Sequence, residues 1–85
     1  MADKTIVSVV YTNHRGETAR RVIRPIRMFF DSTAYHPEPQ WLMEVFCLDR
    51  QETRDMAMAG FDTRTWIAAT DGEIEEALMA FIERE

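Results

Sequence analysis

The segment from Trp41 to Leu48 restricts the fold of this chain most, because it is apolar on both faces of the strand that it predicts. It is eight residues long and lies between polar turns, which favours a central strand. Alternate side chains of a strand share a face. One face carries Trp41, Met43, Val45 and Cys47, and the other carries Leu42, Glu44, Phe46 and Leu48. Both faces then need cover, which we expect from a C-terminal helix or from a partner chain.

The residues before this segment predict a hairpin. Thr5–Tyr11 is rich in β-branched residues, and its two-residue period places Val7, Val9 and Tyr11 on one face. Residues 13–16 have the composition of a turn, and Glu17–Ile23 returns as the second strand. On that strand Arg21 shares a face with Ile23, whereas Arg20 and Arg24 share the other face with Val22.

Pro25 predicts an edge, a bulge or a bend in this second strand, because proline cannot donate a hydrogen bond to a neighbouring strand. Ile26, Met28 and Phe30 continue one face beyond it. A long strand bent at a proline is what a small curled sheet requires.

The region after the apolar segment is less uniform. Thr53–Phe61 predicts a strand from its position after the turn at residues 49–52 and from Gly60 near its end, although its Met and Ala residues also favour helix. Thr63–Ala69 is ambiguous, and Trp66 and Ile67 suit a short last strand.

Residues 71–84 predict an amphipathic helix. Thr70 and Glu73 have the spacing of a capping box, in which each side chain accepts a hydrogen bond from the backbone of the other residue. One face of the helix is apolar and carries Ile74, Ala77, Leu78, Phe81 and Ile82. We expect this face to cover the core rather than to fill the groove of a partner.

Composition excludes several classes of protein. The 85 residues suffice for one domain, and no apolar run approaches the roughly 20 residues of a membrane span. No segment of signal-peptide character follows the N-terminal methionine. A single cysteine, Cys47, excludes an internal disulfide and a multi-cysteine zinc site. We therefore expect a reduced, cytoplasmic setting and no membrane.

No residue pattern predicts catalysis. Cys47 lies in an apolar strand, where a free cysteine behaves as a small hydrophobic residue. His14 lies at a turn, and the two histidines have no recognised metal-ligand spacing with Cys47. The chain has no glycine-rich phosphate loop and no serine elbow. We expect neither an enzyme nor a bound metal or cofactor.

Charge is unevenly distributed along the chain. Residues 1–30 carry six basic and two acidic side chains, and residues 31–85 carry four basic and thirteen acidic ones, which gives a net charge of −5. An acidic chain is a poor general binder of nucleic acid. The arginines of residues 15–27 could still form an anion-binding surface, or they could neutralise acidic neighbours across the sheet.

The loop over residues 31–40 is stiffened by Pro37 and Pro39. It places Tyr35 and His36 at the surface, next to Trp41, as a candidate interface with a partner. The alternative is a structural crossover at one end of the sheet.

The order of short motifs resembles the WYL domain family, named for its Trp-Tyr-Leu motif, over about residues 6–61. The motifs are a strand ending in Tyr11, then residues 15–17, residues 21–25, residues 41–43 and residues 54–61. The resemblance implies an Sm-like small β-barrel, which in bacterial transcription regulators is usually attached to a helix-turn-helix domain. There it is regarded as a sensor of nucleic acid or nucleotide-like ligands through its tyrosine and arginines.

The chain departs from the family at several positions. Leu42 and Met43 stand where the motif has Tyr and Leu, and residues 59–60 are Ala-Gly where the family has Asp-Arg. No DNA-reading helix-turn-helix is present in the chain. The resemblance carries over four candidate ligand residues, namely Tyr11, Arg15, Arg21 and Arg54, and the arginine-rich surface adds Arg20 and Arg24.

The sequence thus predicts a mainly β, α+β domain. It consists of an Sm-like antiparallel β-barrel of about five strands over residues 5–69 and an amphipathic helix that caps it over residues 70–84. The predicted function is a non-enzymatic ligand-sensing module for an anionic or nucleotide-like ligand, including nucleic acid. The alternative is a protein-interaction module, with a protein partner or a second copy of the chain.

Overall fold

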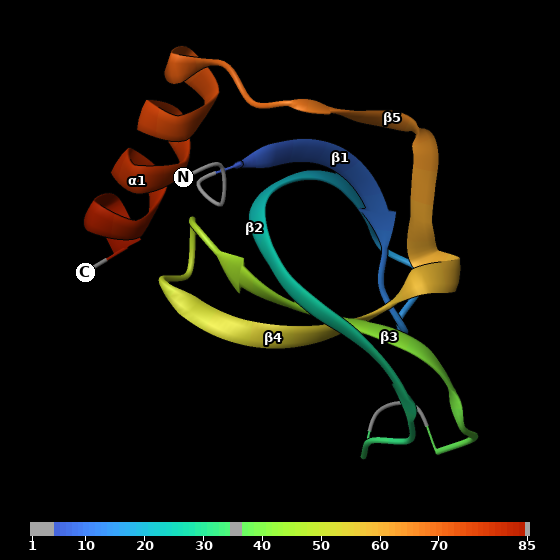
Figure 1. Cartoon of the computed structure of the whole chain (residues 1–85). Helices are drawn as coiled ribbons and strands as arrows, with labels where there is room; N and C mark the ends of the chain where they lie inside the picture. The colour runs from blue at the N-terminus through green and yellow to red at the C-terminus, as the bar shows by residue number, and fades with distance from the viewer. Residues whose placement is uncertain (1–4, 35–36, 85) are drawn as a thin grey trace.

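The computed structural model describes residues 5–34 and 37–84, which form five strands and one C-terminal helix (Figure 1). The strands are β1 (Val7–Thr12), β2 (Thr18–Asp31), β3 (Gln40–Cys47), β4 (Glu52–Ala57) and β5 (Phe61–Ala68). One turn of 3-10 helix, η2 (Met58–Gly60), joins β4 to β5, and helix α1 (Asp71–Arg84) follows. The mainly β class with a C-terminal helix is confirmed.

The strands make one antiparallel sheet in the order β4-β3-β2-β1-β5. β4 and β5 follow each other in the chain, yet they are the two opposite edges of the sheet. The sheet curls strongly about β2, as Figure 1 shows. Among the described residues, no backbone ladder joins β4 to β5, so the sheet is open where the sequence led us to expect a closed barrel.

β2 owes its length and its bend to an irregularity at Pro25. Pro25 pairs with Val45 and Arg27 pairs with Glu44, so the register shifts by one residue at Ile26. The bulge takes up Ile26, directly after the proline that cannot donate to the ladder, and it sharpens the local twist. The strand therefore continues through Pro25 to Asp31, which confirms the prediction of a long strand that bends at this proline.

The concave face of the curl holds the core. Its buried residues are Val7, Val9, Tyr11, Ile23, Met43, Val45, Cys47, Met56 and Phe61. The predicted alternation is confirmed along the first strand and along the third strand from Met43 to Cys47, whereas Trp41, on the same predicted face, is exposed. Leu42 is also fully buried, on the opposite face of β3.

The fourth predicted strand is shorter than expected. It ends at Ala57, and the chain then turns through η2 before β5 begins at Phe61. A Cβ atom added to Gly60 would lie 2.7 Å from Cε1 of Tyr11 and closer still to the carbonyl oxygen of Thr12. The missing side chain of Gly60 therefore lets η2 cross close over the end of β1, and the ambiguous segment that follows becomes β5.

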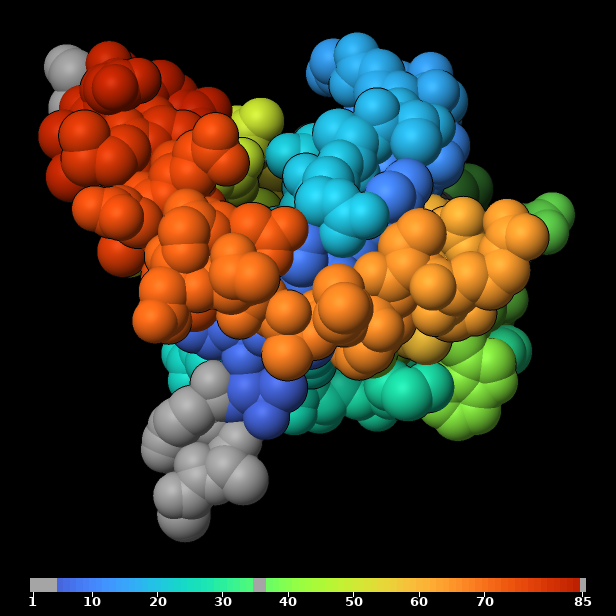
Figure 2. Space-filling model, turned by 90° about the horizontal axis from the view of Figure 1, so that it is seen from above, coloured from blue at the N-terminus to red at the C-terminus, as the bar shows by residue number. Residues whose placement is uncertain are grey.

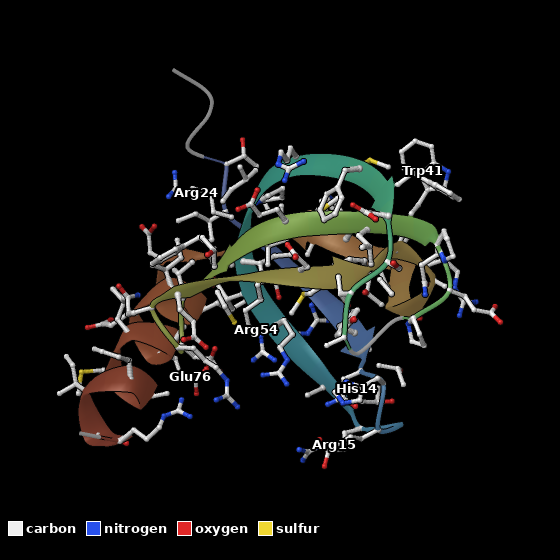
Figure 3. All side chains as sticks on the ribbon, turned by 90° about the horizontal axis from the view of Figure 1, so that it is seen from below. His14, Arg15, Arg24, Trp41, Arg54 and Glu76 are labelled. Atoms are coloured by element: carbon white, nitrogen blue, oxygen red, sulfur yellow. The ribbon has the colours of Figure 1, made fainter. Side chains whose placement is uncertain are left out.

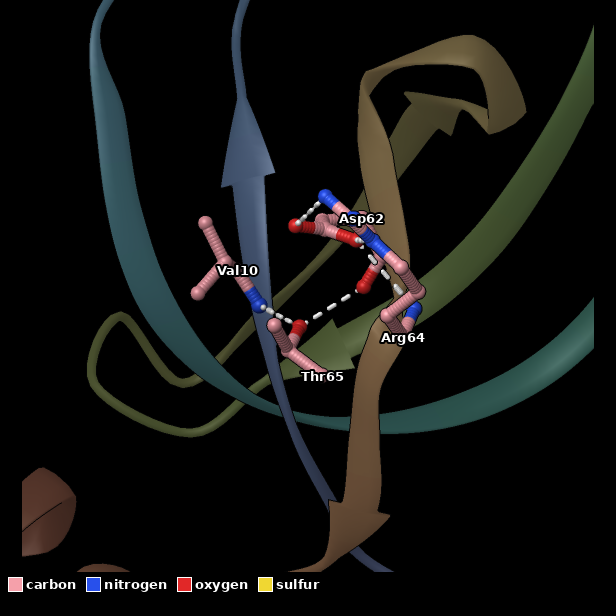
Figure 4. A network of polar contacts seen from close by, with 4 residues as sticks. All are labelled: Val10, Asp62, Arg64 and Thr65. Atoms are coloured by element: carbon pink, nitrogen blue, oxygen red, sulfur yellow. Dashed lines mark hydrogen bonds and ion pairs between the residues drawn. The ribbon is translucent and has the colours of Figure 1, made fainter.

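The β1–β5 pair is irregular between Ser8 and Val10, and a side chain fills the gap in the ladder (Figure 4). The amide of Val10 donates to Oγ1 of Thr65 at 2.8 Å, and the Thr65 hydroxyl donates to the carbonyl oxygen of Asp62 at 2.7 Å. Arg64 donates through Nε to Oδ1 of Asp62 at 3.1 Å and holds the pKa of that carboxyl below its usual value. This network fixes the bend of β5 and is structural.

Helix α1 begins with the predicted capping box. The amide of Glu73 donates to Oγ1 of Thr70 at 3.1 Å, and the amide of Thr70 donates to Oε1 of Glu73 at 2.9 Å. Hydrogen bonds from the Ser8 hydroxyl to Glu73, at 3.0 Å, and from Arg84 to the Asp49 carbonyl, at 2.9 Å, tie the helix to the rest of the fold.

The prediction that the apolar helix face covers the core holds only in part, since Ile74 and Phe81 are half-buried but no helix residue belongs to the core cluster. Ala77 is the buried residue of the helix, whereas Leu78 and Ile82 remain 40% and 59% exposed. The concave face is already filled by the side chains of the strands, so the helix lies at the convex face, near Ser8 and Val22. Figure 2 shows it as a lobe beside the strands.

Candidate anion-binding site

A cavity of about 200 Å³ opens where the concave face meets the β1–β2 turn and the β3–β4 turn. Four arginines line it: Arg15, Arg21, Arg50 and Arg54. Glu17 and Asp55 are the carboxylates in its lining, so the charged side chains carry a net of two positive charges. This surplus stands out in a chain whose net charge is −5.

Four different elements bring these arginines together. Arg21 lies on β2 opposite Val9, and Arg54 lies on β4 opposite Val45, so both point to the concave side with their buried partners. Arg15 comes from the β1–β2 turn and Arg50 from the β3–β4 turn. The curl of the sheet thus places two strand arginines beside two turn arginines.

The side chain of Asn13 orders the turn that carries Arg15. Oδ1 of Asn13 accepts hydrogen bonds from the amides of Arg15 and Glu17, each at 2.9 Å, and Nδ2 of Asn13 donates to Oε1 of Glu17. Gly16 has a φ of 83°, the left-handed conformation that glycine adopts without strain. The position of Arg15 is therefore fixed by its own turn.

Tyr11 closes the inner end of the cavity. Its ring packs on Phe61, with the centroids 4.8 Å apart, and its Oη accepts a hydrogen bond from the amide of Ala57 at 3.1 Å. Burial raises the pKa of Tyr11, while the Ala57 amide and the charges of Arg54 and Arg21 oppose that rise. The hydroxyl is protonated at neutral pH and can donate its hydrogen.

The hydrogen-bond donors of Arg21 are not all paired within the described part of the chain. Its Nη1 lies 3.6 Å from Oδ2 of Asp49, and its buried Nε has no hydrogen-bond partner among the described residues. The same Asp49 accepts a hydrogen bond from Sγ of Cys47 at 3.1 Å. Burial, with this bond to Asp49, raises the pKa of Cys47 to about 11, so the thiol stays protonated and unreactive at neutral pH.

The predicted surface of arginines 15–27 does not exist as one patch. Side chains alternate along β2, so Arg20 and Arg24 lie on the convex side. Nη1 of Arg20 donates to Oγ of Ser8 at 2.8 Å near the helix, and the guanidinium of Arg24 lies over the ring of Phe46. Figure 3 shows Arg15, His14 and Arg54 towards one end of the molecule, with Arg24 and Trp41 towards the other.

Arg50 is the cavity arginine that the sequence patterns did not predict. It sits in a turn, where neither alternation nor the family motifs single it out. The predicted hairpin of the third and fourth strands could have indicated it. The turn of that hairpin, which carries Arg50, lies at the end of β4 that also carries Arg54.

The predicted interface is described only in part. Trp41 is 54% exposed, and its ring meets that of Phe30 edge-on with the centroids 5.5 Å apart. Tyr35 and His36 lie outside the described residues. Within residues 5–34 and 37–84, no three His, Cys, Asp or Glu side chains are grouped so as to hold a metal ion. No helix in this part of the chain has the length and apolar character to cross a membrane.

Comparison with protein-family models, with curated proteins and with solved structures gives no match to this chain. The candidate site therefore stands on its geometry and charge.

Proposed function

We propose that this chain is a non-enzymatic module that binds an anionic ligand in the cavity formed by Tyr11, Arg15, Arg21, Arg50 and Arg54. The observation that carries the proposal is the convergence of four guanidinium groups, from two strands and two turns, on one cavity. A guanidinium presents a planar fork of donors that matches the oxygens of phosphate or carboxylate groups.

The resemblance to the WYL family supports the same site. The four residues that it carries over, Tyr11, Arg15, Arg21 and Arg54, all line this one cavity, although they come from widely separated positions. As part of the proposal, the curled sheet is an Sm-like small barrel that is open between β4 and β5, and the protein acts in the bacterial cytoplasm. Arg20 and Arg24 are not part of the proposed site.

Calorimetric titration with pyrophosphate tests the proposal. We expect binding that weakens steeply between about 50 and 200 mM salt, because charge neutralisation drives it. Arg54→Gln should weaken binding at least about tenfold, since hydrogen bonds to charged groups contribute roughly 1.5–3 kcal/mol. Arg24→Gln is the matched control and should bind as the wild type does. The absence of heat at the lowest salt concentration would remove the proposal.

A second candidate function is protein association through helix α1. Leu78 and Ile82, which lie on one side of the helix, are 40% and 59% exposed, and exposed apolar patches commonly mark interfaces. Sedimentation velocity over a concentration series tests self-association. A dimer that Leu78→Gln dissociates would support this candidate, and a monomer at the highest concentration would exclude it.

A further inference from the structure

We infer that the ligand of the arginine cavity is a compact oxyanion of the phosphate type, bound without contacts to a nucleobase or to a nucleic-acid chain. This inference rests on the proposed function and narrows its ligand class. Four properties of the cavity support it, namely its volume, its aromatic lining, the charge of the hollow beside it and its hydrogen-bond donors.

The cavity is small. Its volume of about 200 Å³ is below the roughly 300–1,000 Å³ of pockets that enclose drug-sized ligands. Phosphate and pyrophosphate groups are within this size, whereas a whole nucleotide would extend outside it. The cavity thus suits the charged group and not the base and sugar.

Among the described residues, the cavity lining includes no tryptophan or phenylalanine face on which a base could stack, and its exposed ring is the imidazole of His14. Recognition of single-stranded nucleic acid relies on aromatic faces that are open to solvent. The ring of Tyr11 is 5% exposed and packs on Phe61, so its face is not available. The exposed aromatic side chains of Phe30, Trp41 and Trp66 are absent from the lining of this cavity.

The positive charge of the cavity does not continue into the largest hollow described beside it. A neighbouring hollow of about 530 Å³ shares Arg50, Arg54 and Asp55 with it and adds Glu52. Two arginines and two carboxylates balance there, so a chain of phosphates leaving the cavity would gain no further attraction. Since the whole protein carries a charge of −5, a long polyanion would also be repelled.

The donors of the cavity wall suit a multiply charged oxyanion. Among the described residues, the Arg21 guanidinium has a 3.6 Å contact with Asp49 and a buried Nε without a partner, which leaves it capacity for a closer acceptor. Oη of Tyr11 already accepts from Ala57, which leaves its hydrogen free to be donated. Several oxygens on one small group can accept from these donors together, which a single carbonyl or hydroxyl cannot do.

Calorimetry of the whole chain at low salt separates the ligand classes. The probes are pyrophosphate, tripolyphosphate, ATP, adenosine and a single-stranded oligothymidylate without terminal phosphates. We expect ATP to bind within about threefold of tripolyphosphate, adenosine not to bind, and the oligothymidylate to bind more weakly than pyrophosphate. Preference for ATP over tripolyphosphate by about tenfold, binding of adenosine, or preference for the oligothymidylate would overturn the inference.

Two variants assign the binding to the cavity. Arg21→Gln and Arg50→Gln should each weaken pyrophosphate binding at least about tenfold, whereas Arg24→Gln should leave it unchanged. Arg50 is exposed in a turn, so its replacement tests the cavity even where Arg21→Gln disturbs folding. Failure of every phosphate probe to bind would defeat the proposed function as well, whereas a preference for ATP or oligothymidylate would defeat this inference alone. Equal loss in Arg24→Gln would place the ligand elsewhere and contradict both.

Discussion

The hydroxyl oxygen of Tyr11 accepts a hydrogen bond from the backbone amide of Ala57 at 3.1 Å, across 46 residues of sequence. β1 and β4 are not neighbours in the sheet, so this bond crosses the interior of the curl rather than running along a ladder. It joins the two strands that contribute Tyr11 and Arg54 to the cavity. One tyrosine thus contributes to the shape of the sheet and to the wall of the site.

Tyr11→Phe should destabilise the protein by about 1–3 kcal/mol, because it leaves the buried amide of Ala57 without an acceptor. Urea denaturation followed by tryptophan fluorescence measures this change. A loss well below 1 kcal/mol, with an unchanged dependence on urea, would show that the bond does not hold the curl together.

Gly60→Ala should destabilise the protein by about 1–3 kcal/mol through overpacking, because the new methyl group would meet the backbone of Thr12 and the ring of Tyr11. Gly72→Ala provides the control, since a Cβ there has its nearest neighbour at 3.9 Å, on Thr70. In the helix, that change should stabilise the protein by up to about 1 kcal/mol. Thermal unfolding of both variants measures whether each change lowers or raises stability. Equal effects of the two changes would contradict the claim that η2 needs a glycine at position 60.

Glu73 should make stability depend on pH in the acid range. The hydrogen bond from the Thr70 amide, with one from the Ser8 hydroxyl, lowers the pKa of Glu73 below its ordinary value near 4.5. Its contribution is therefore complete above that value and is lost as the pH falls through the lowered pKa of the folded state.

Urea denaturation between neutral pH and about pH 3 measures the effect of Glu73. In Glu73→Gln, the free energy of unfolding should fall less steeply as the pH is lowered than it does in the wild type. Glu75→Gln, at an exposed position of the same helix, is the control and should keep the wild-type profile. A Glu73→Gln profile that parallels the wild type would show that Glu73 titrates alike in the folded and unfolded states, so that its hydrogen bonds do not lower its pKa.

Cys47 should resist thiol reagents in the native protein. Its pKa of about 11 leaves far less thiolate at pH 8 than the free value near 8.5 would, so labelling should be slower than in urea by at least about a hundredfold. Asp49→Asn should accelerate labelling only slightly, because burial is the larger cause of the raised pKa. Rapid labelling of the native protein would mean that this strand opens readily.

Short-range sequence patterns predicted the features that depend on neighbouring residues alone. Alternation placed Val7, Val9 and Tyr11 on one face, and the spacing of Thr70 and Glu73 predicted the helix start. Long-range geometry was beyond these patterns. The filled concave face decides that Leu78 and Ile82 remain exposed, and the order of the strands leaves the sheet open between β4 and β5.

The candidate site shows the same division. Alternation on β2 places Arg21 on one face and Arg20 and Arg24 on the other. A single surface made of all these arginines is incompatible with that alternation. Arg50 enters the cavity because the β3–β4 turn and the β1–β2 turn both border it, a relationship that only the curled sheet creates. A linear run of arginines is therefore a poorer guide to a site than the face on which each arginine lies.

A titration of isotope-labelled protein with pyrophosphate, followed by NMR of the backbone amides, tests the central claim most directly. We predict that the largest shifts fall on the amides around Tyr11, Arg15, Arg21, Arg50 and Arg54, and that those of Arg24 and the helix stay in place. Shifts concentrated at Arg24, at the helix or at Trp41, or no shifts at low salt, would contradict the assignment of this cavity as an anion site.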